Sequence, residues 1–191
     1  MPKVSTLEIV KTEWEIRRVR FKLGKDIIPG STVTSVVVTP SSGDINVISS
    51  TPAGEDVIVL FSGGFIAQSP YTISLLALMS NGEKVQLDGI VHVVAQTLAL
   101  EESLKTIAEE RLLDFVFADK MFPEEGEVID SAVIDAINPT GGFNVTGDIF
   151  FGVIAQGEAR AGLVATYTVR ARVTTSLGQQ LEGFGKVKVV S

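Results

Sequence analysis

Residues 71–94 read YTISLLALMSNGEKVQLDGIVHVV, and residues 167–190 read YTVRARVTTSLGQQLEGFGKVKVV. The two stretches align without a gap at a shift of 96 residues (167 − 71). They share eight identities: Tyr71/Tyr167, Thr72/Thr168, Ser80/Ser176, Gly82/Gly178, Gly89/Gly185, Val91/Val187, Val93/Val189 and Val94/Val190. This recurrence indicates that one structural unit is present twice.

A second match lies upstream of the first. Residues 10–23, VKTEWEIRRVRFKL, align with residues 104–117, LKTIAEERLLDFVF, at a shift of 94 (115 − 21). The shared residues are Lys11/Lys105, Thr12/Thr106, Glu15/Glu109, Arg17/Arg111 and Phe21/Phe115. The change of shift implies a net insertion of two residues in the second copy. We therefore expect two domains, 1–95 and 96–191, each of a size typical of a small sandwich.

Apolar and polar residues alternate along the repeated stretch. In 167–175, Tyr167, Val169, Ala171 and Val173 alternate with Thr168, Arg170, Arg172 and Thr174. A period of two is typical of a strand with one buried face. The pattern predicts an all-β chain of two tandem immunoglobulin-like β-sandwiches with about six strands per copy. These are expected near 19–23, 32–40, 45–48, 56–61, 71–79 and 85–94, then 113–117, 128–136, 143–145, 148–154, 167–175 and 181–190.

The repeat also predicts a turn and a buried contact. Asn81-Gly82 separates two apolar runs and favours a hairpin with a type I′ turn. The second copy has Leu177 before Gly178, so we expect a different turn there. Tyr71 and Tyr167 each follow a loop of small residues, and we interpret both as tyrosine corners that bond back to the loop backbone.

The segment between the two copies has two interpretations. Residues 98–113, LALEESLKTIAEERLL, place Leu100, Leu104, Ile107 and Ala108 on one helical face, which favours a short helix near 101–109. The repeat instead aligns this segment with residues 6–19, which suit an extended chain. Both alternatives remain open at this point.

Composition argues against several classes of function. The chain has 191 residues, no Cys and one His, which excludes disulfides, thiolate metal sites and a cysteine nucleophile. The net charge of −7 argues against nucleic acid as a partner. No apolar run is long enough to span a bilayer, and no signal peptide is visible at the N-terminus. His92 aligns with outward-facing Lys188, so we expect no enzyme, no cofactor and no metal site.

Charge and the single Trp indicate a candidate docking site. Residues 1–94 carry 8 basic and 9 acidic residues, whereas residues 95–191 carry 8 and 14. The basic residues of the first copy include Arg17, Arg18, Arg20, Lys22 and Lys25. They form either a charged edge strand that resists aggregation or a docking edge for an acidic partner, such as a second subunit. Trp14 is either a core or interface anchor or a platform for a sugar ring.

Several motifs resemble a family of small bacteriophage virion proteins with Ig-like domains, commonly labelled fibre–tail adaptors. They are LLDFVFADKMFPEEGEVIDSAVI (112–134), ATYTVRARVTTSLGQQLEGFGKVKVV (165–190) and VLFSGGFIAQSPYTI (59–73). The resemblance implies a virion component that assembles in the host cytoplasm.

The residues and the resemblance together leave three expected functions. The first is a capsid decoration (cement) protein that stabilises the shell, with the major capsid protein as its partner. The second is a tail or fibre adaptor. The third is a carbohydrate-binding adhesin module. In the first two cases we expect a homo-oligomer on the particle and neither nucleic acid nor membrane as a partner.

Overall fold

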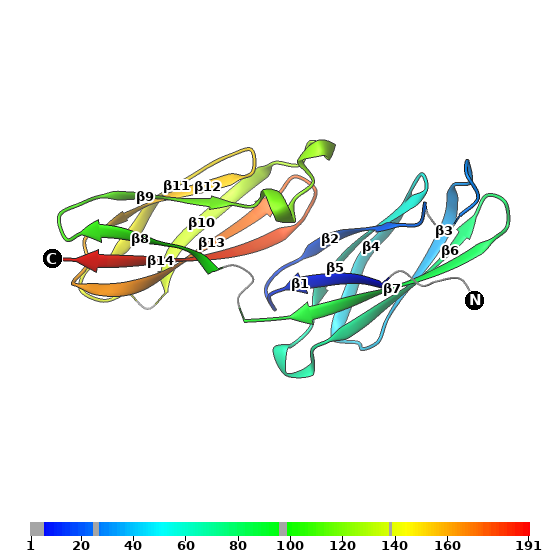
Figure 1. Cartoon of the computed structure of the whole chain (residues 1–191), viewed down its shortest axis with the longest axis horizontal. Coiled ribbons are helices and arrows are strands. Elements are labelled where there is room, and N and C mark those ends of the chain that lie inside the picture. Colours follow the sequence, from blue (N-terminus) through cyan, green and yellow to red (C-terminus); the bar gives the residue numbers. More distant parts are fainter. Residues whose placement is uncertain (1–5, 25–26, 96–98, 138) are drawn as a thin grey trace. The chain divides into compact units, whose positions relative to one another are not determined.

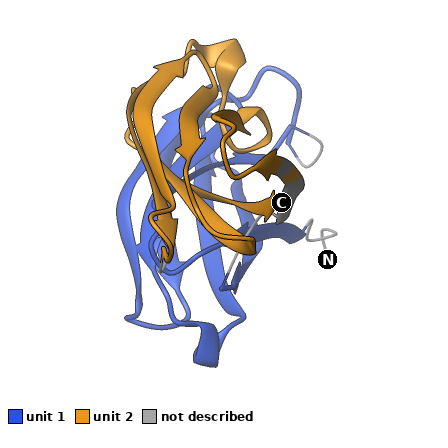
Figure 2. Ribbon diagram, turned by 90° about the vertical axis from the view of Figure 1, so that its left-hand side faces the viewer, with its two compact units in different colours: residues 1–95 blue, residues 96–191 orange. Residues whose placement is uncertain are grey.

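The chain folds into two compact units, Met1–Ala95 and Gln96–Ser191 (Figures 1 and 2). The computed structural model describes residues 6–24, 27–95, 99–137 and 139–191. Within them, each unit is a sandwich of one four-stranded and one three-stranded sheet. The described helical segments are short 3₁₀ turns, and no helix in this part of the chain is long and apolar enough to cross a bilayer.

Unit 1, residues 1–95, contains two sheets in the orders β1-β7-β6-β3 and β2-β5-β4. All pairs are antiparallel except β1 and β7, which run parallel. The strands are β1 (Thr6–Lys11), β2 (Arg17–Lys22), β3 (Val33–Pro40), β4 (Ile45–Ala53), β5 (Asp56–Gly63), β6 (Tyr71–Met79) and β7 (Lys84–Val93).

Unit 2, residues 96–191, repeats this topology. Its sheets have the orders β8-β14-β13-β10 and β9-β12-β11, and β8 runs parallel to β14. The strands are β8 (Ala99–Thr106), β9 (Arg111–Val116), β10 (Ile129–Ile137), β11 (Asn144–Phe151), β12 (Ile154–Arg160), β13 (Ala165–Thr175) and β14 (Gln180–Val190). Consecutive strands cross repeatedly between two facing sheets, so both units are immunoglobulin-like β-sandwiches.

Each unit has its own hydrophobic core between its sheets. The inward residues of the β6–β7 hairpin supply one wall in unit 1, and Phe21 and Phe61 come from the opposite sheet. In unit 2, β13 and β14 supply the corresponding wall, and Phe115 comes from β9. The alternation seen in the sequence is therefore the alternation of core and outer faces.

Of the two alternatives for the segment between the copies, the extended chain is confirmed and the short helix near 101–109 is wrong, because β8 occupies Ala99–Thr106. Pairing with the open edge of β14 satisfies the backbone of this segment, with Ser103 opposite Val187 and Lys105 opposite Val189. A tertiary hydrogen-bonded pairing thus overrides a weak local helical pattern. The same pairing adds β1 to unit 1, so each unit has seven described strands instead of about six.

Two further expectations also fail in detail. The strand expected at 148–154 spans a turn, because β11 ends at Phe151, Gly152 has φ +56°, and β12 begins at Ile154. The Asn81-Gly82 turn is not type I′, since Ala161 is the only described non-glycine residue with positive φ. Instead, Met79 N–H donates to Glu83 O and Gly82 has φ +87°, which is a three-residue loop ending in a left-handed glycine.

The second copy uses the same turn, contrary to our expectation of a different type. Thr175 N–H donates to Gln179 O, and Gly178 has φ +81°. The left-handed glycine determines this turn, so the residue before it can be Asn or Leu.

Tyr71 and Tyr167 lie at equivalent corners, each at the start of a core hairpin. The Tyr71 hydroxyl accepts a bond from Phe65 N at 2.8 Å and lies 3.3 Å from Phe65 O. The Tyr167 hydroxyl accepts from Leu163 N at 2.9 Å and donates to Leu163 O at 3.1 Å. Each hydroxyl thus holds a loop to the sandwich.

We expect Tyr71→Phe to lower the free energy of unfolding of unit 1 by about 1–2 kcal/mol, because the loop N–H at Phe65 loses its acceptor. Trp14 is the only Trp of the chain and lies in unit 1, so its fluorescence follows the unfolding of that unit. Tyr167→Phe is the matched control and should leave the Trp14 transition unchanged. An equal shift of that transition by both variants would mean that the hydroxyls do not act locally.

Candidate docking surface

The basic stretch of the first copy forms β2, an edge strand of its sheet. Val19 and Phe21 point into the core, and the alternating residues Arg18, Arg20 and Lys22 lie on the outer face. Arg17 lies opposite the buried Phe61, at the first position of the strand. Three cations therefore lie on the outer side of an edge strand, and we call them the cationic edge (Arg18, Arg20, Lys22). Lys22 is exposed, whereas Arg18 and Arg20 are half-buried. Lys25 lies outside the described residues.

The carboxylate of Asp56 lies beside the cationic edge. Asp56 begins β5 opposite Lys22, and its Oδ2 lies 3.6 Å from Nη1 of Arg20. Both side chains are partly exposed, so this ion pair contributes little to stability. It holds Arg20 in place while Lys22 stays exposed.

A groove of about 570 Å³ adjoins the cationic edge, where β1 and β2, edge strands of the two sheets, face each other. Its lining has polar and apolar side chains: the polar ones are Thr6, Arg20, Lys22 and Asp56, and the apolar ones are Leu7, Phe21 and Leu87. Cations beside an apolar floor suit a ligand that carries both acidic and apolar groups.

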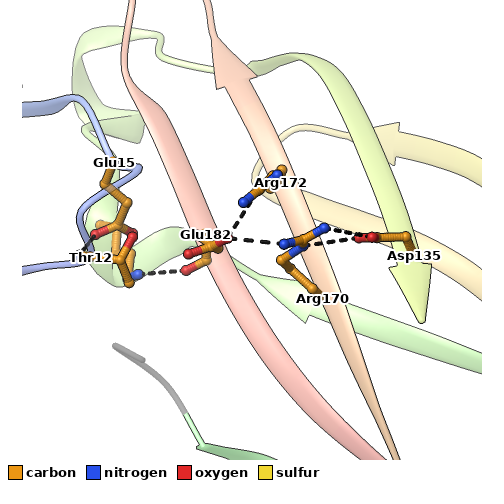
Figure 3. Close-up of polar contacts among 7 residues, drawn as sticks. Thr12, Glu15, Asp135, Arg170, Arg172 and Glu182 are labelled. Atoms are coloured by element: carbon orange, nitrogen blue, oxygen red, sulfur yellow. Dashed lines mark hydrogen bonds and ion pairs between the residues drawn. The ribbon is translucent and has the colours of Figure 1, made fainter. Parts of the chain in front are cut away.

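Trp14 lies in the loop that leads from β1 into β2, and it is partly buried. The loop is held from both sides. Thr12 N–H donates to Glu15 Oε2 at 2.9 Å (Figure 3), and Ile66 N–H donates to Glu13 Oε1 at 2.9 Å. The structure thus places Trp14 just before the first residue of β2.

Sequence reasoning missed the residue that anchors this loop, Lys11. Its side chain is fully buried, and its Nζ donates to Thr12 O at 2.6 Å and to Gly63 O at 2.8 Å. Burial lowers the pKa of Lys11 from 10.5 to about 8, although nearby Glu15 opposes this effect. Lys105 repeats the contacts in unit 2, with Thr106 O at 2.9 Å and Ala161 O at 2.8 Å. The Lys-Thr-x-x-Glu motif, which occurs in both copies, was the sequence signal that could have identified this lysine.

The corresponding strand of unit 2 has different chemistry. At the shift of 94 residues, the positions of the cationic edge are occupied by Leu112, Asp114 and Val116 of β9. All three are exposed. The corresponding three-stranded sheets of the two units therefore have outer faces of different chemistry.

The four-stranded sheets also differ on their outer faces. In unit 2, Arg170 pairs with Asp135 at 2.6 Å and Arg172 with Glu182 at 2.9 Å (Figure 3). The hydrogen bond to Asp135 raises the pKa of Arg170. Unit 1 has Ser74 and Leu76 at the positions of the two arginines, and Ser74 donates to Asp88 at 2.7 Å.

His92 lies on the outer face of β7. Its Nε2 is 2.7 Å from Glu8 Oε2 on the neighbouring β1, and the pair is exposed. The described residues include no group of three or more His, Cys, Asp or Glu side chains that could hold a metal ion.

Comparison with known protein families and with curated proteins finds no match. Among solved structures, the tandem Ig repeats of Dlar match 98% of this chain and 95% of their own length, at 11% identity and a TM-score of 0.33. Domains 4 and 5 of the S-layer protein SbsC match 83% and 78%, at 12% identity and a TM-score of 0.35.

An endo-fucoidan hydrolase of glycoside hydrolase family 107 matches 98% of the chain, at 10% identity and a TM-score of 0.34. The chain spans 33% of the length of that enzyme. These TM-scores are too low for the similarities to indicate a function. The immunoglobulin-like assignment rests on the strand order and crossings described above.

Proposed function

We propose that the chain is a non-catalytic structural protein of a bacteriophage particle, a capsid decoration protein that binds the assembled shell. The observation that carries the proposal is the cationic edge with its adjoining groove, on a unit whose duplicate lacks those cations. The resemblance of the repeated motifs to virion proteins with Ig-like domains supports the choice of particle.

The cationic edge suits an acidic segment of the shell protein. Arg18, Arg20 and Lys22 project at every second residue, the spacing at which an extended segment presents side chains of one face. Each pair contributes little when exposed, but copies repeated over a shell add many such contacts in parallel. Trp14 and the groove supply apolar surface beside the charges.

We expect Lys22→Glu to weaken binding to shells that lack the protein by about tenfold or more, because one attraction becomes a repulsion (~1.4 kcal/mol or more). Co-sedimentation with purified shells at low salt measures this. Lys84→Glu is the matched control: it makes the same charge change at an exposed position on the other sheet of unit 1. Equal binding by both variants would exclude the cationic edge as the docking site.

Imaging of particles with and without the protein tests its position. The decoration proposal expects density to be lost from the shell. Loss of density at the tail with an intact shell would overturn it in favour of a tail or fibre adaptor, the function for which the resembling family is labelled.

A carbohydrate-binding adhesin is the second candidate function, and the partly exposed Trp14 favours it. A sugar ring stacking on Trp14 predicts binding to host polysaccharide that is lost in Trp14→Ala while the fold is retained. Retained binding in that variant would remove this candidate.

A further inference from the structure

The outer face of the β11-β12-β9 sheet carries an unusual amount of apolar surface. We call it the unit 2 apolar face: Leu112, Val116, Ile149, Phe151 and Ile154. Leu112 is 59% exposed and Phe151 is 54% exposed. Solvent-facing sides of antiparallel sheets are ordinarily polar, and contiguous exposed apolar surface marks an interaction site.

The register shows that four of these residues are neighbours, whereas Leu112 lies opposite Glu158 of β12. Ile154 of β12 lies opposite Phe151 on one side and Val116 on the other, which makes a continuous row across the sheet. The next row on the same face is Ile149, Gln156 and Asp114, and Gln156 donates to Asp114 at 2.7 Å. An acidic group thus lies in the middle of β9, between Leu112 and Val116.

The same sheet of unit 1 has the opposite arrangement. Its edge positions hold the cationic edge, whereas its central strand β5 presents Ile58 and Leu60, which are half-buried and lie opposite Arg20 and Arg18. Unit 1 thus has two apolar residues with cations on their β2 side only, since Ser49 and Thr51 lie opposite them on β4. Unit 2 instead has apolar residues around the carboxylate of Asp114.

We infer that these two faces bind each other between copies: the β2-β5-β4 face of one copy packs on the unit 2 apolar face of the next. The inference goes beyond the proposed function: a second copy of this chain covers the cationic edge when no shell is present, and the shell competes with that copy for the same residues. Cross pairing covers apolar surface on both sides and brings opposite charges together.

Self-pairing of either face is disfavoured by charge. Two unit 2 faces would bring Asp114 against its own copy, between halves that each carry 8 basic and 14 acidic residues. Pairing two cationic edges would place the three cations of one copy against the same three cations of the other. The interface is therefore heterologous, and a heterologous interface produces a closed ring or an open chain of copies.

Sedimentation velocity of the full chain over a range of concentration and salt tests this inference. We expect assembly beyond a dimer that salt weakens. Asp114→Lys and Lys22→Glu should each weaken assembly about tenfold, whereas Lys84→Glu should not. An equimolar mixture of the first two variants should assemble again, because each interface in the mixture then joins opposite charges.

Three outcomes would overturn the inference: a monomer at every concentration, assembly indifferent to Asp114→Lys, or a closed dimer that Asp114→Lys strengthens, which indicates self-pairing of unit 2. The shell-binding assay separates this inference from the proposed function. A monomer that binds shells contradicts only the interface between copies, and an assembling protein that ignores shells contradicts only the decoration role.

Discussion

Lys11→Ala is expected to lower the free energy of unfolding of unit 1 by about 3 kcal/mol. The substitution removes a fully buried side chain, so a cavity remains where its alkyl stem packed. It also leaves the carbonyl oxygens of Thr12 and Gly63 without the donor that joins them. A loss of this size is a large part of the 5–15 kcal/mol typical of a domain.

Urea unfolding followed by Trp14 fluorescence measures the effect. The matched control is Lys105→Ala, which removes the equivalent donor from Thr106 and Ala161 in unit 2. The control should leave the Trp14 transition in place and shift only the signal of unit 2 in far-UV circular dichroism. Lys11→Ala with wild-type stability would mean that water replaces the ammonium without cost.

The pH dependence provides an independent measurement of the same side chain. The folded pKa is about 8 and the ordinary value is 10.5, so above pH 8 the unfolded chain binds more protons at this site than the folded one. Stability therefore rises as pH increases from 8 towards 10.5, and below pH 8 the full cost of burying the charge is present.

Lys11→Met isolates this contribution, because it keeps the stem and removes the titrating group. Relative to this variant, the wild type should gain about 2 kcal/mol between pH 7 and pH 9.5. A difference between the two proteins that stays constant with pH would show that the lysine is not desolvated in the folded state.

The sequence was sufficient to predict the sandwiches but not their first strands. Tyr71–Met79 and Lys84–Val93 are joined by a short turn, so their alternation and their pairing are both local. β1 and β8 instead pair in parallel with strands about 80 residues later in the sequence. No local sequence pattern indicates which strand each of them pairs with. β11 and β12 were misplaced because the apolar run IFFGVIA continues through the turn at Gly152.

The candidate site was predictable where it depends on spacing. Alternation places Arg18, Arg20 and Lys22 on one side of any strand at 17–22. Asp56 and the groove depend on register and on the facing sheet, which the sequence does not reveal. The burial of Lys11 was missed because lysines are almost never fully buried unless they are paired, and its acceptor Gly63 is distant in the sequence.

Gly63→Ala is the second substitution with a large expected effect, a loss of about 3 kcal/mol or more from unit 1. Gly63 ends β5 with φ +81°, a conformation that side chains rarely adopt, and an added Cβ would collide with the backbone oxygen of Asp44. That oxygen accepts a bond from Gly64 N at 2.8 Å, so it cannot move away without breaking this contact. The carbonyl that Gly63 offers to Lys11 would shift as well.

The steric collision, rather than the positive φ, carries most of this cost. Ala161 of unit 2 holds the corresponding place, since its oxygen accepts from Lys105, and it has φ +53°. Gly82→Ala is the matched control within unit 1, because Gly82 has φ +87° and an added Cβ would meet nothing within 4 Å. We expect about 1 kcal/mol for the control in the same Trp14 unfolding assay. If the two variants lose the same free energy of unfolding, the backbone around Asp44 moves to accommodate the added methyl group. The loop that Lys11 anchors would then be more easily deformed than its buried contacts imply.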